Sequence, residues 1–279
     1  MNEGMLIIIF AVLGLCLGSF VNAAVWRIKV KKDIVHDRSE CVHCHHKLAA
    51  SDLVPIISWL MLGGKCRYCK KPISSQYPLV ELAVMLYFVL SYLLWPVALD
   101  TPYAWIDFGL WLSYGVGLAI LFVYDLKWYL LPDKVVWPLV ALGGVDFINN
   151  ALWHHWSPLQ FITELTFAVM VIAGVYYVLY FISKGKWIGF GDVKLGLFMG
   201  LALGWQAGLV ALLLANVIGC VIVIPGLALG KLRRDSRIPF GPLLIIGFVL
   251  AGVWGRQLFE GYINWGPQFF DWYDSGFGL

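Results

Sequence analysis

"GLALGWQAG", residues 200–208, lies in the middle of an apolar run that decides how many helices this chain forms. The run extends for 36 residues between Lys194 and Lys231. A helix that crosses a bilayer needs about 20 apolar residues, so the run is too long for one upright span and short for two. Clustered glycines favour a turn. The sequence therefore predicts two short helices joined by a tight turn within residues 200–208.

Six further apolar runs have a length near that of a membrane span. They are Met5–Trp26, Pro78–Pro96, Tyr103–Tyr124, Val135–Trp153, Leu159–Ile182 and Pro239–Phe259. With 61% hydrophobic and only 13% charged residues, the composition excludes an ordinary soluble protein. The first run is not a cleavable signal peptide, because its basic residues follow the apolar stretch instead of preceding it. We therefore expect an all-α polytopic membrane protein with about eight transmembrane helices.

The positions of lysine and arginine predict the orientation of these spans, because basic loops stay in the cytoplasm. With eight spans and the N-terminus outside, 19 of the 20 basic residues lie on the inner side. The inner segments are Arg27–Tyr77, Asp125–Lys134, Ser183–Lys194 and Lys231–Arg237. A single span in place of the two short helices would put one of the two basic segments that flank this run, Ser183–Lys194 or Lys231–Arg237, on the outer side. The net charge of +3 thus comes from basic residues that set the membrane orientation, and it does not point to a nucleic-acid partner.

The first basic segment carries four cysteines in two pairs, each with the spacing C-x2-C. They are Cys41, Cys44, Cys66 and Cys69. Two such pairs place four thiolates within tetrahedral reach of one zinc ion, in a closed site with no position for water. We therefore predict a structural zinc ion that helps a small loop to fold. The alternatives are a redox pair or four unrelated cysteines, although a reducing cytoplasm disfavours disulfides.

Two acids stand out because each lies where an apolar run meets the predicted inner membrane surface. Asp125 ends a run in "YDLKWYLLPD", where Pro132 stops or kinks the helix. Asp192 begins a run in "GFGDVKLG", where Gly189 and Gly191 allow backbone shapes closed to other residues and a close approach of a neighbouring segment. Both acids are therefore expected at the same membrane depth.

Two carboxyl groups brought together in a partly desolvated site share one proton, and aspartic proteases use this arrangement. The charged acid takes a proton from the attacking water and the neutral acid donates to the peptide carbonyl. From the residues alone, Asp125 and Asp192 are thus candidates for an aspartyl pair. The alternative is that they form ion pairs with Lys127 and Lys194.

The order of these motifs resembles that of the type IV prepilin peptidases, a family of GxGD membrane aspartic proteases. The similar stretches are "GSFVN" (Gly18–Asn22), "RSECVHC" through "GGKCRYCKKPISSQYPLVE", "YDLKWYLLPD", "GFGDVKLG" and "IPFGPLL" (Ile238–Leu244). The resemblance covers nearly the whole chain. The family often has a second acid or a histidine soon after its first aspartate, where this chain has Lys127 and Trp128.

The resemblance implies a bifunctional enzyme with Asp125 and Asp192 as its catalytic acids and the four paired cysteines as its zinc ligands. Such an enzyme cleaves the basic leader of a prepilin or pseudopilin at the cytoplasmic membrane face. It then methylates the new N-terminal residue with S-adenosylmethionine, whose contacts the sequence does not assign. The implied location is the bacterial cytoplasmic (inner) membrane, with both termini periplasmic. The lipid bilayer and prepilins are its expected partners, and the oligomeric state stays open.

The expected organisation has four parts. They are a first transmembrane helix (1–26), a cytoplasmic tetracysteine zinc-binding domain (27–77), a seven-helix membrane catalytic domain (78–259) and a periplasmic tail (260–279). Two other functions fit parts of the pattern. One is a transporter or channel in which Asp125 and Asp192 relay ions or protons. The other is a membrane zinc protease, which the lack of an H-E-x-x-H motif disfavours.

Overall fold

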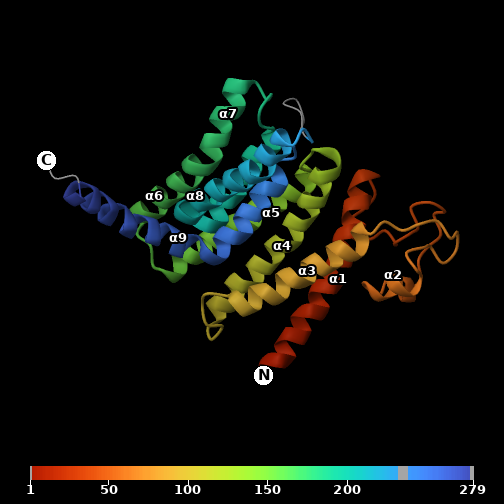
Figure 1. The fold of residues 1–279 in the computed structure, drawn as a ribbon. Coiled ribbons are helices and arrows are strands. Elements are labelled where there is room, and N and C mark those ends of the chain that lie inside the picture. The colour runs from red at the N-terminus through yellow and green to blue at the C-terminus, as the bar shows by residue number, and fades with distance from the viewer. Residues whose placement is uncertain (1, 232–237, 277–279) are drawn as a thin grey trace. The chain divides into compact units, whose positions relative to one another are not determined.

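A computed structural model of the chain describes residues 2–231 and 238–276, with side chains up to residue 264 (Figure 1). The described residues form helices and loops with no strand longer than an isolated bridge. Seven of the helical segments are long and apolar enough to cross a membrane. The predicted class, an all-α polytopic membrane protein, is confirmed.

The elements, in chain order, are α1 (Glu3–Lys29), η1 (Ala50–Asp52), α2 (Ile57–Met61), α3 (Gln76–Leu94), α4 (Pro102–Trp128), α5 (Asp133–Trp153), α6 (Pro158–Ala168), the π-helix η2 (Val169–Gly174), α7 (Val175–Ser183), α8 (Phe190–Ala228) and α9 (Gly241–Gly276). They divide into two compact units, Met1–Trp128 and Tyr129–Leu279.

In the first unit, α1 and α3 pack closely because glycines remove side chains from their contact (Figure 1). A Cβ atom on Gly14 would lie 2.7 Å from the Cα of Met85, and one on Gly18 would lie 2.6 Å from the Cα of Glu81. Small residues of this kind let membrane helices approach each other. Gly18 of the "GSFVN" stretch therefore has a packing role at the helix crossing.

In the second unit, α5 and α9 pack on α8, and α6, η2 and α7 form one continuous span across it. Glycines again mark the tightest contacts. A Cβ atom on Gly200 would lie 2.2 Å from the carbonyl oxygen of Ala168, and one on Gly247 would lie 2.4 Å from that of Ala211. The π-helix presents buried Ile172 to this packing.

The long helix α8 turns back on itself at Gly204, where φ is 71° and ψ is 175°. This conformation suits glycine, because it has no Cβ atom. Added Cβ atoms on Gly196 and Gly208 would both lie within 3.5 Å of the Ile172 side chain. In a straight helix these two residues would stand about 18 Å apart. The predicted pair of helices with a glycine turn within residues 200–208 is thus confirmed, because two helices meet at Gly204.

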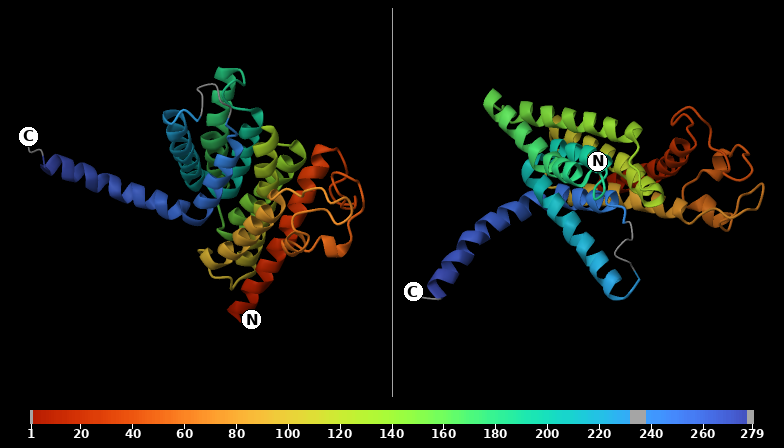
Figure 2. Two further views of the ribbon diagram at one scale, coloured as in Figure 1. Left: turned by 45° about the vertical axis from the view of Figure 1, so that its right-hand side comes forward. Right: turned by 90° about the horizontal axis from the view of Figure 1, so that it is seen from above.

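The last helix, α9, runs from Gly241 to Gly276 and extends away from the other helices of its unit in both views of Figure 2. The candidate membrane span within it covers Gly241–Asn264 among the described side chains. The backbone remains helical through residue 260, where the sequence predicted the start of a tail. Most of the predicted basic segment 231–237 lies outside the described residues.

Replacement of Gly200 by alanine is expected to destabilise the second unit, because the added methyl group would overlap the backbone of Ala168. Overpacking of this kind costs about 1–3 kcal/mol. Gly144→Ala is the matched control, since a Cβ atom there meets nothing within 4 Å. We expect the apparent melting temperature in detergent to fall for the first variant and to hold or rise slightly for the second. Equal melting temperatures would contradict the close contact between α6 and α8.

Candidate functional site

The structure brings the four paired cysteines together in the loop between α1 and α3. The sulfur atoms of Cys41, Cys44, Cys66 and Cys69 all lie within 4.8 Å of one another. The sulfurs of Cys41 and Cys69, from different pairs, are 3.9 Å apart. Four thiolates around a tetrahedral zinc ion stand about 3.8 Å apart, given Zn–S bonds of about 2.3 Å. The donor set therefore fits the metal ion predicted from the spacing, and these four residues would hold it.

Each cysteine pair is carried by the same backbone turn. The amide of His45 donates to the carbonyl of Cys41 over 2.9 Å, and the amide of Lys70 donates to that of Cys66 over 3.0 Å. His45 and Lys70 both have positive φ values, 56° and 60°. This repeated geometry aims both pairs of sulfurs at one point, which indicates a metal site and argues against unrelated cysteines.

Side chains between the two turns hold the loop together. His46 and Tyr68 stack with ring centroids 3.7 Å apart. The Arg67 guanidinium contacts the Asp52 carboxylate over 2.6 Å, and the Tyr68 hydroxyl donates to the same carboxylate. Burial opposes ionisation of Asp52, but hydrogen bonds from Arg67, the Ala49 amide and Tyr68 outweigh it and lower the pKa of Asp52. The loop thus has a small polar framework of its own beside the cysteines.

Asp192 lies in the first turn of α8, where its carboxylate accepts a hydrogen bond from the Gly189 amide over 3.1 Å. The positive end of the helix dipole favours a negative charge at this position. A Cβ atom on Gly191 would lie 3.0 Å from the Leu131 side chain. The close approach predicted for Gly191 is therefore confirmed. The prediction of an unusual backbone shape at these glycines is wrong, because neither Gly189 nor Gly191 has a positive φ.

The start of α5 lies beside the start of α8 in the second unit. Lys194, in the first turns of α8, forms an ion pair with Asp133, in the first turn of α5. Lys194 thus has an acidic partner other than Asp192.

Asp125 lies in the last turn of α4, with 6% of its surface exposed. The helix ends at Trp128 and the next one begins after Pro132, as the sequence predicted. Lys127 lies over the Trp128 ring, 5.7 Å from its centroid, and forms no ion pair among the described residues. Asp125 and Asp192 belong to different units, so their meeting stays a prediction.

The end of α4 that carries Asp125 is also the end of the first unit that carries the cysteine loop. Lys29, at the end of α1, lies 4.7 Å from the centroid of the Trp128 ring. Lys127 lines the same cavity as Cys41 and Cys66. Within this unit, the acid and the cysteine loop therefore share one end of the helices.

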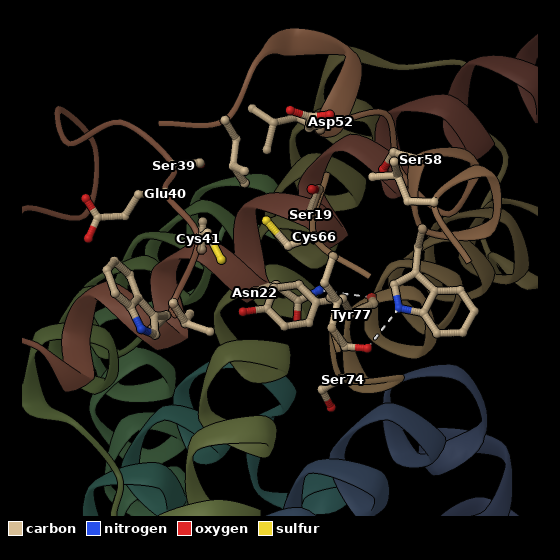
Figure 3. Close-up of a pocket in the computed structure, with 18 of the residues that line it drawn as sticks. Ser19, Asn22, Ser39, Glu40, Cys41, Asp52, Ser58, Cys66, Ser74 and Tyr77 are labelled. Atoms are coloured by element: carbon tan, nitrogen blue, oxygen red, sulfur yellow. Dashed lines mark hydrogen bonds between the residues drawn. The ribbon is translucent and has the colours of Figure 1, made fainter. Parts of the chain in front are cut away.

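A cavity of about 420 Å³ lies between the cysteine loop, the last turns of α1 and the first turns of α3 (Figure 3). Asn22 crosses its floor, since its amide nitrogen donates to the Tyr77 carbonyl over 3.0 Å and its oxygen accepts from Gln76. Glu81 is buried beneath the loop and accepts a hydrogen bond from the Ile56 amide over 2.7 Å. The asparagine of "GSFVN" and the glutamate of "YPLVE" therefore meet at one cavity.

Sequence reasoning missed two buried polar groups. Glu81 lies in the first turns of a helix, where solvation is the ordinary expectation, but the folded loop covers it. The second group is Tyr176 of α7, which the sequence did not single out and which is 3% exposed. It lies within electrostatic range of Asp192, and its hydroxyl has no hydrogen-bond partner among the described residues. In the sequence, the only sign of either residue is a polar side chain within an apolar run.

These features define a class: a polytopic membrane protein with a loop of four clustered cysteines after its first helix and an acid at a glycine-rich helix start. Two family descriptions match the chain in this order. The "Bacterial Peptidase A24 N-terminal domain" matches residues 12–95, and the "Type IV leader peptidase family" matches residues 112–224. The chain belongs to the type IV leader peptidase family.

Relatives of similar length carry the name "Prepilin leader peptidase/N-methyltransferase". The protein of Stutzerimonas stutzeri is 30% identical over 91% of this chain and 92% of its own length. The protein of Aeromonas hydrophila is 34% identical over 81% and 75%, and that of Pseudomonas aeruginosa is 30% identical over 90% and 91%. No solved structure gave a significant match.

Proposed function

We propose that this chain is an aspartic endopeptidase that cleaves the basic leader of type IV prepilins or pseudopilins and then methylates the new N-terminus. The observation that carries the proposal is similarity over nine-tenths of the chain to proteins with that double name. The rival function, an ion relay in a transporter or channel, has no support from these relatives.

In the proposed cleavage step, Asp125 and Asp192 share one proton. The ionised acid removes a proton from water as the water oxygen attacks the peptide carbonyl, and the protonated acid donates to the carbonyl oxygen. Collapse of the tetrahedral intermediate breaks the C–N bond and returns a proton to the leaving amine. Support comes from the burial of Asp125 at a helix end and from the capping position of Asp192.

The chain link between α4 and α5 is compatible with this pairing. Residues 129–132 are the whole connection between the two helices. Four residues span at most about 14 Å when fully extended. Asp125 lies one turn before the link, and Asp133 directly after it pairs with Lys194 in the helix of Asp192. A proposed meeting of the two acids therefore needs no long connection.

The proposed metal is zinc, held by the four cysteines in a structural role. All four donors are protein sulfurs, so the site offers no open position where a metal-bound water would attack a substrate. Cleavage is therefore assigned to the acids, and the metal is assigned to the fold of the loop.

Sidedness belongs to the proposal as well. The basic residues predict that the cysteine loop and both acids face the cytoplasm and that both termini are periplasmic. A prepilin with a cytoplasmic leader and a membrane-embedded helix has its scissile bond at this same surface. The proposed acids therefore lie at the depth at which such a substrate is cut.

Methyl transfer needs a donor of the S-adenosylmethionine type, which supplies a methyl group on a positively charged sulfur. The amine nitrogen of the cleaved pilin forms a bond to the methyl carbon as the carbon–sulfur bond breaks. Its electron pair remains on sulfur, and the amine gives up one proton. The support for this step is the second half of the relatives' name.

The proposed function is tested by incubation of the purified protein with a prepilin and isotopically labelled S-adenosylmethionine. Mass measurement of the products is expected to give a peptide cut at the leader junction and carrying one labelled methyl group. The control is the same incubation with a zinc chelator, in which initial cleavage is expected to continue. A protein that moves ions in liposomes but leaves the prepilin intact would refute the proposal.

A further inference from the structure

We propose that the Tyr176 hydroxyl donates a hydrogen bond to the scissile peptide of a bound prepilin, at the carbonyl oxygen on which negative charge develops during cleavage. The inference rests on the proposed peptidase function and adds a residue to its chemistry. Tyr176 lies in the first turn of α7, in the same compact unit as Asp192. Its place beside that acid is therefore given within one unit.

The hydroxyl of Tyr176 is a buried donor without a partner. The residue is 3% exposed, and its oxygen has no hydrogen-bond partner within the part of the chain that the structure describes. Protein interiors rarely leave a polar atom in this condition, because the atom loses its bonds to water and gains none in return. Such a hydroxyl indicates an acceptor that comes from outside the chain.

Asp192 is the acid closest in effect to this hydroxyl. Its negative charge acts on Tyr176, although the two groups form no hydrogen bond. Residues 184–189 join α7 to α8, and the two helices pack against each other. Gly196, about one turn after Asp192 on α8, lies against the tyrosine ring. A peptide held between the hydroxyl and the carboxyl group would contact both.

Two of the sequence motifs hold the tyrosine ring. Gly196 of "GFGDVKLG" leaves room for it, since a Cβ atom there would lie 3.1 Å from the Cδ2 atom of Tyr176. Phe240 of "IPFGPLL" packs edge to face with the ring, with centroids 5.9 Å apart. The Phe240 carbonyl accepts from the amides of Leu243 and Leu244 at the start of α9. The donor is thus fixed in advance, as stabilisation of a transition state requires.

The π-helix η2 ends directly before this turn. It covers Val169–Gly174, and Tyr176 is the second residue of the α-helix that follows. Short π-helical turns interrupt α-helices mostly at functional sites. Within this turn, Ile172 and Ala173 lie 3.5 Å from the position of a Cβ atom on Gly196. The irregular turn is therefore part of the packing that places the tyrosine beside α8.

In the proposed cleavage step, the hydroxyl is a second donor to the carbonyl oxygen. The protonated acid gives its proton to that oxygen, whereas Tyr176 keeps its own proton, so the proton balance of the step is unchanged. A donor in a site without water stabilises developing charge strongly, because the local dielectric constant is low. The peptide reaches the buried hydroxyl only once a covering side chain moves, and substrate-induced movements of this kind are common in enzymes.

The test compares Tyr176→Phe with the wild type in prepilin cleavage and in thermal unfolding in detergent. Phenylalanine keeps the ring against Gly196 and Phe240 and removes only the hydroxyl. We expect kcat to fall about 100-fold with KM nearly unchanged. This is the lower end of the range for loss of one such donor, because the protonated acid still donates to the same oxygen. The apparent melting temperature is expected to hold or rise, since an unpaired buried hydroxyl is removed.

Two other tyrosines provide matched controls. Tyr177→Phe removes a hydroxyl from the next residue of α7, which is 51% exposed, and is expected to change neither kcat nor the melting temperature. Tyr87→Phe removes a hydroxyl that donates to the Trp111 carbonyl over 2.7 Å. It is expected to lower the melting temperature and to leave kcat unchanged. The three variants separate a hydroxyl that stabilises the fold from one that acts on the substrate.

Unchanged kcat in folded Tyr176→Phe would overturn the inference, even where the wild type cleaves a prepilin. A lower kcat together with a lower melting temperature would also overturn it, because the hydroxyl would then have a structural role. A higher KM with unchanged kcat would refute the role in the transition state. A wild type that leaves the prepilin intact refutes the proposed function itself, and the inference falls with it.

Discussion

Asp192→Asn is expected to lower kcat/KM for prepilin cleavage by about 10³- to 10⁴-fold. The side chains have the same shape, and the asparagine oxygen can still accept the hydrogen bond of the Gly189 amide at the start of α8. The fold is therefore kept, whereas the shared proton is lost. General acid–base groups contribute about 10²–10⁴-fold, and removal of one member of a pair disables the other. Cleavage is measured with a purified prepilin in detergent.

Asp133→Asn is the matched control, because Asp133 is also an acid in the first turn of a helix. It loses an ion pair with Lys194 in which Asp133 is largely exposed, and such pairs contribute little. We expect its kcat/KM to stay within about threefold of the wild type. Asp125→Asn is expected to match Asp192→Asn, and the double variant is expected to be no worse than either. Additive losses would mean that the two acids do not act as a pair.

The parts of the structure that were predictable from the sequence are those set by local chemistry. The C-x2-C spacing fixes which sulfurs one turn can bring together, and the structure repeats that turn at Cys41 and Cys66. The length of the apolar run and its glycines required a reversal, and Gly204 provides it. The proline before Asp133 stops one helix and precedes the next. In each case the deciding residues lie close together in the chain.

The parts that could not be predicted depend on which distant segment covers a side chain. Glu81 begins a helix, where solvent is the ordinary expectation. It is buried because Ile56, 25 residues earlier, folds back on it. Likewise, Gly191 is explained by the Leu131 side chain packed against it and not by its own backbone angles. Tertiary neighbours of this kind leave no mark in a single sequence.

Loss of the zinc ion predicted from the cysteine pairs is expected to have the second large effect. Cys66→Ser takes away one of four thiolates, and a structural zinc ion in a small domain contributes about 10–16 kcal/mol to folding. Residues 39–74 are therefore expected to become sensitive to protease, and bound zinc is expected to fall from one ion per chain to nearly none. Metal analysis and limited proteolysis measure both.

Cys16→Ser and Cys220→Ser are the controls, because these cysteines lie in α1 and α8 outside the cluster. They are expected to leave zinc content unchanged. Initial prepilin cleavage should persist in Cys66→Ser, because the acids are assigned to the chemistry and the metal to the loop. A Cys66→Ser protein that retains one zinc ion and a protected loop would show that these cysteines are not its ligands.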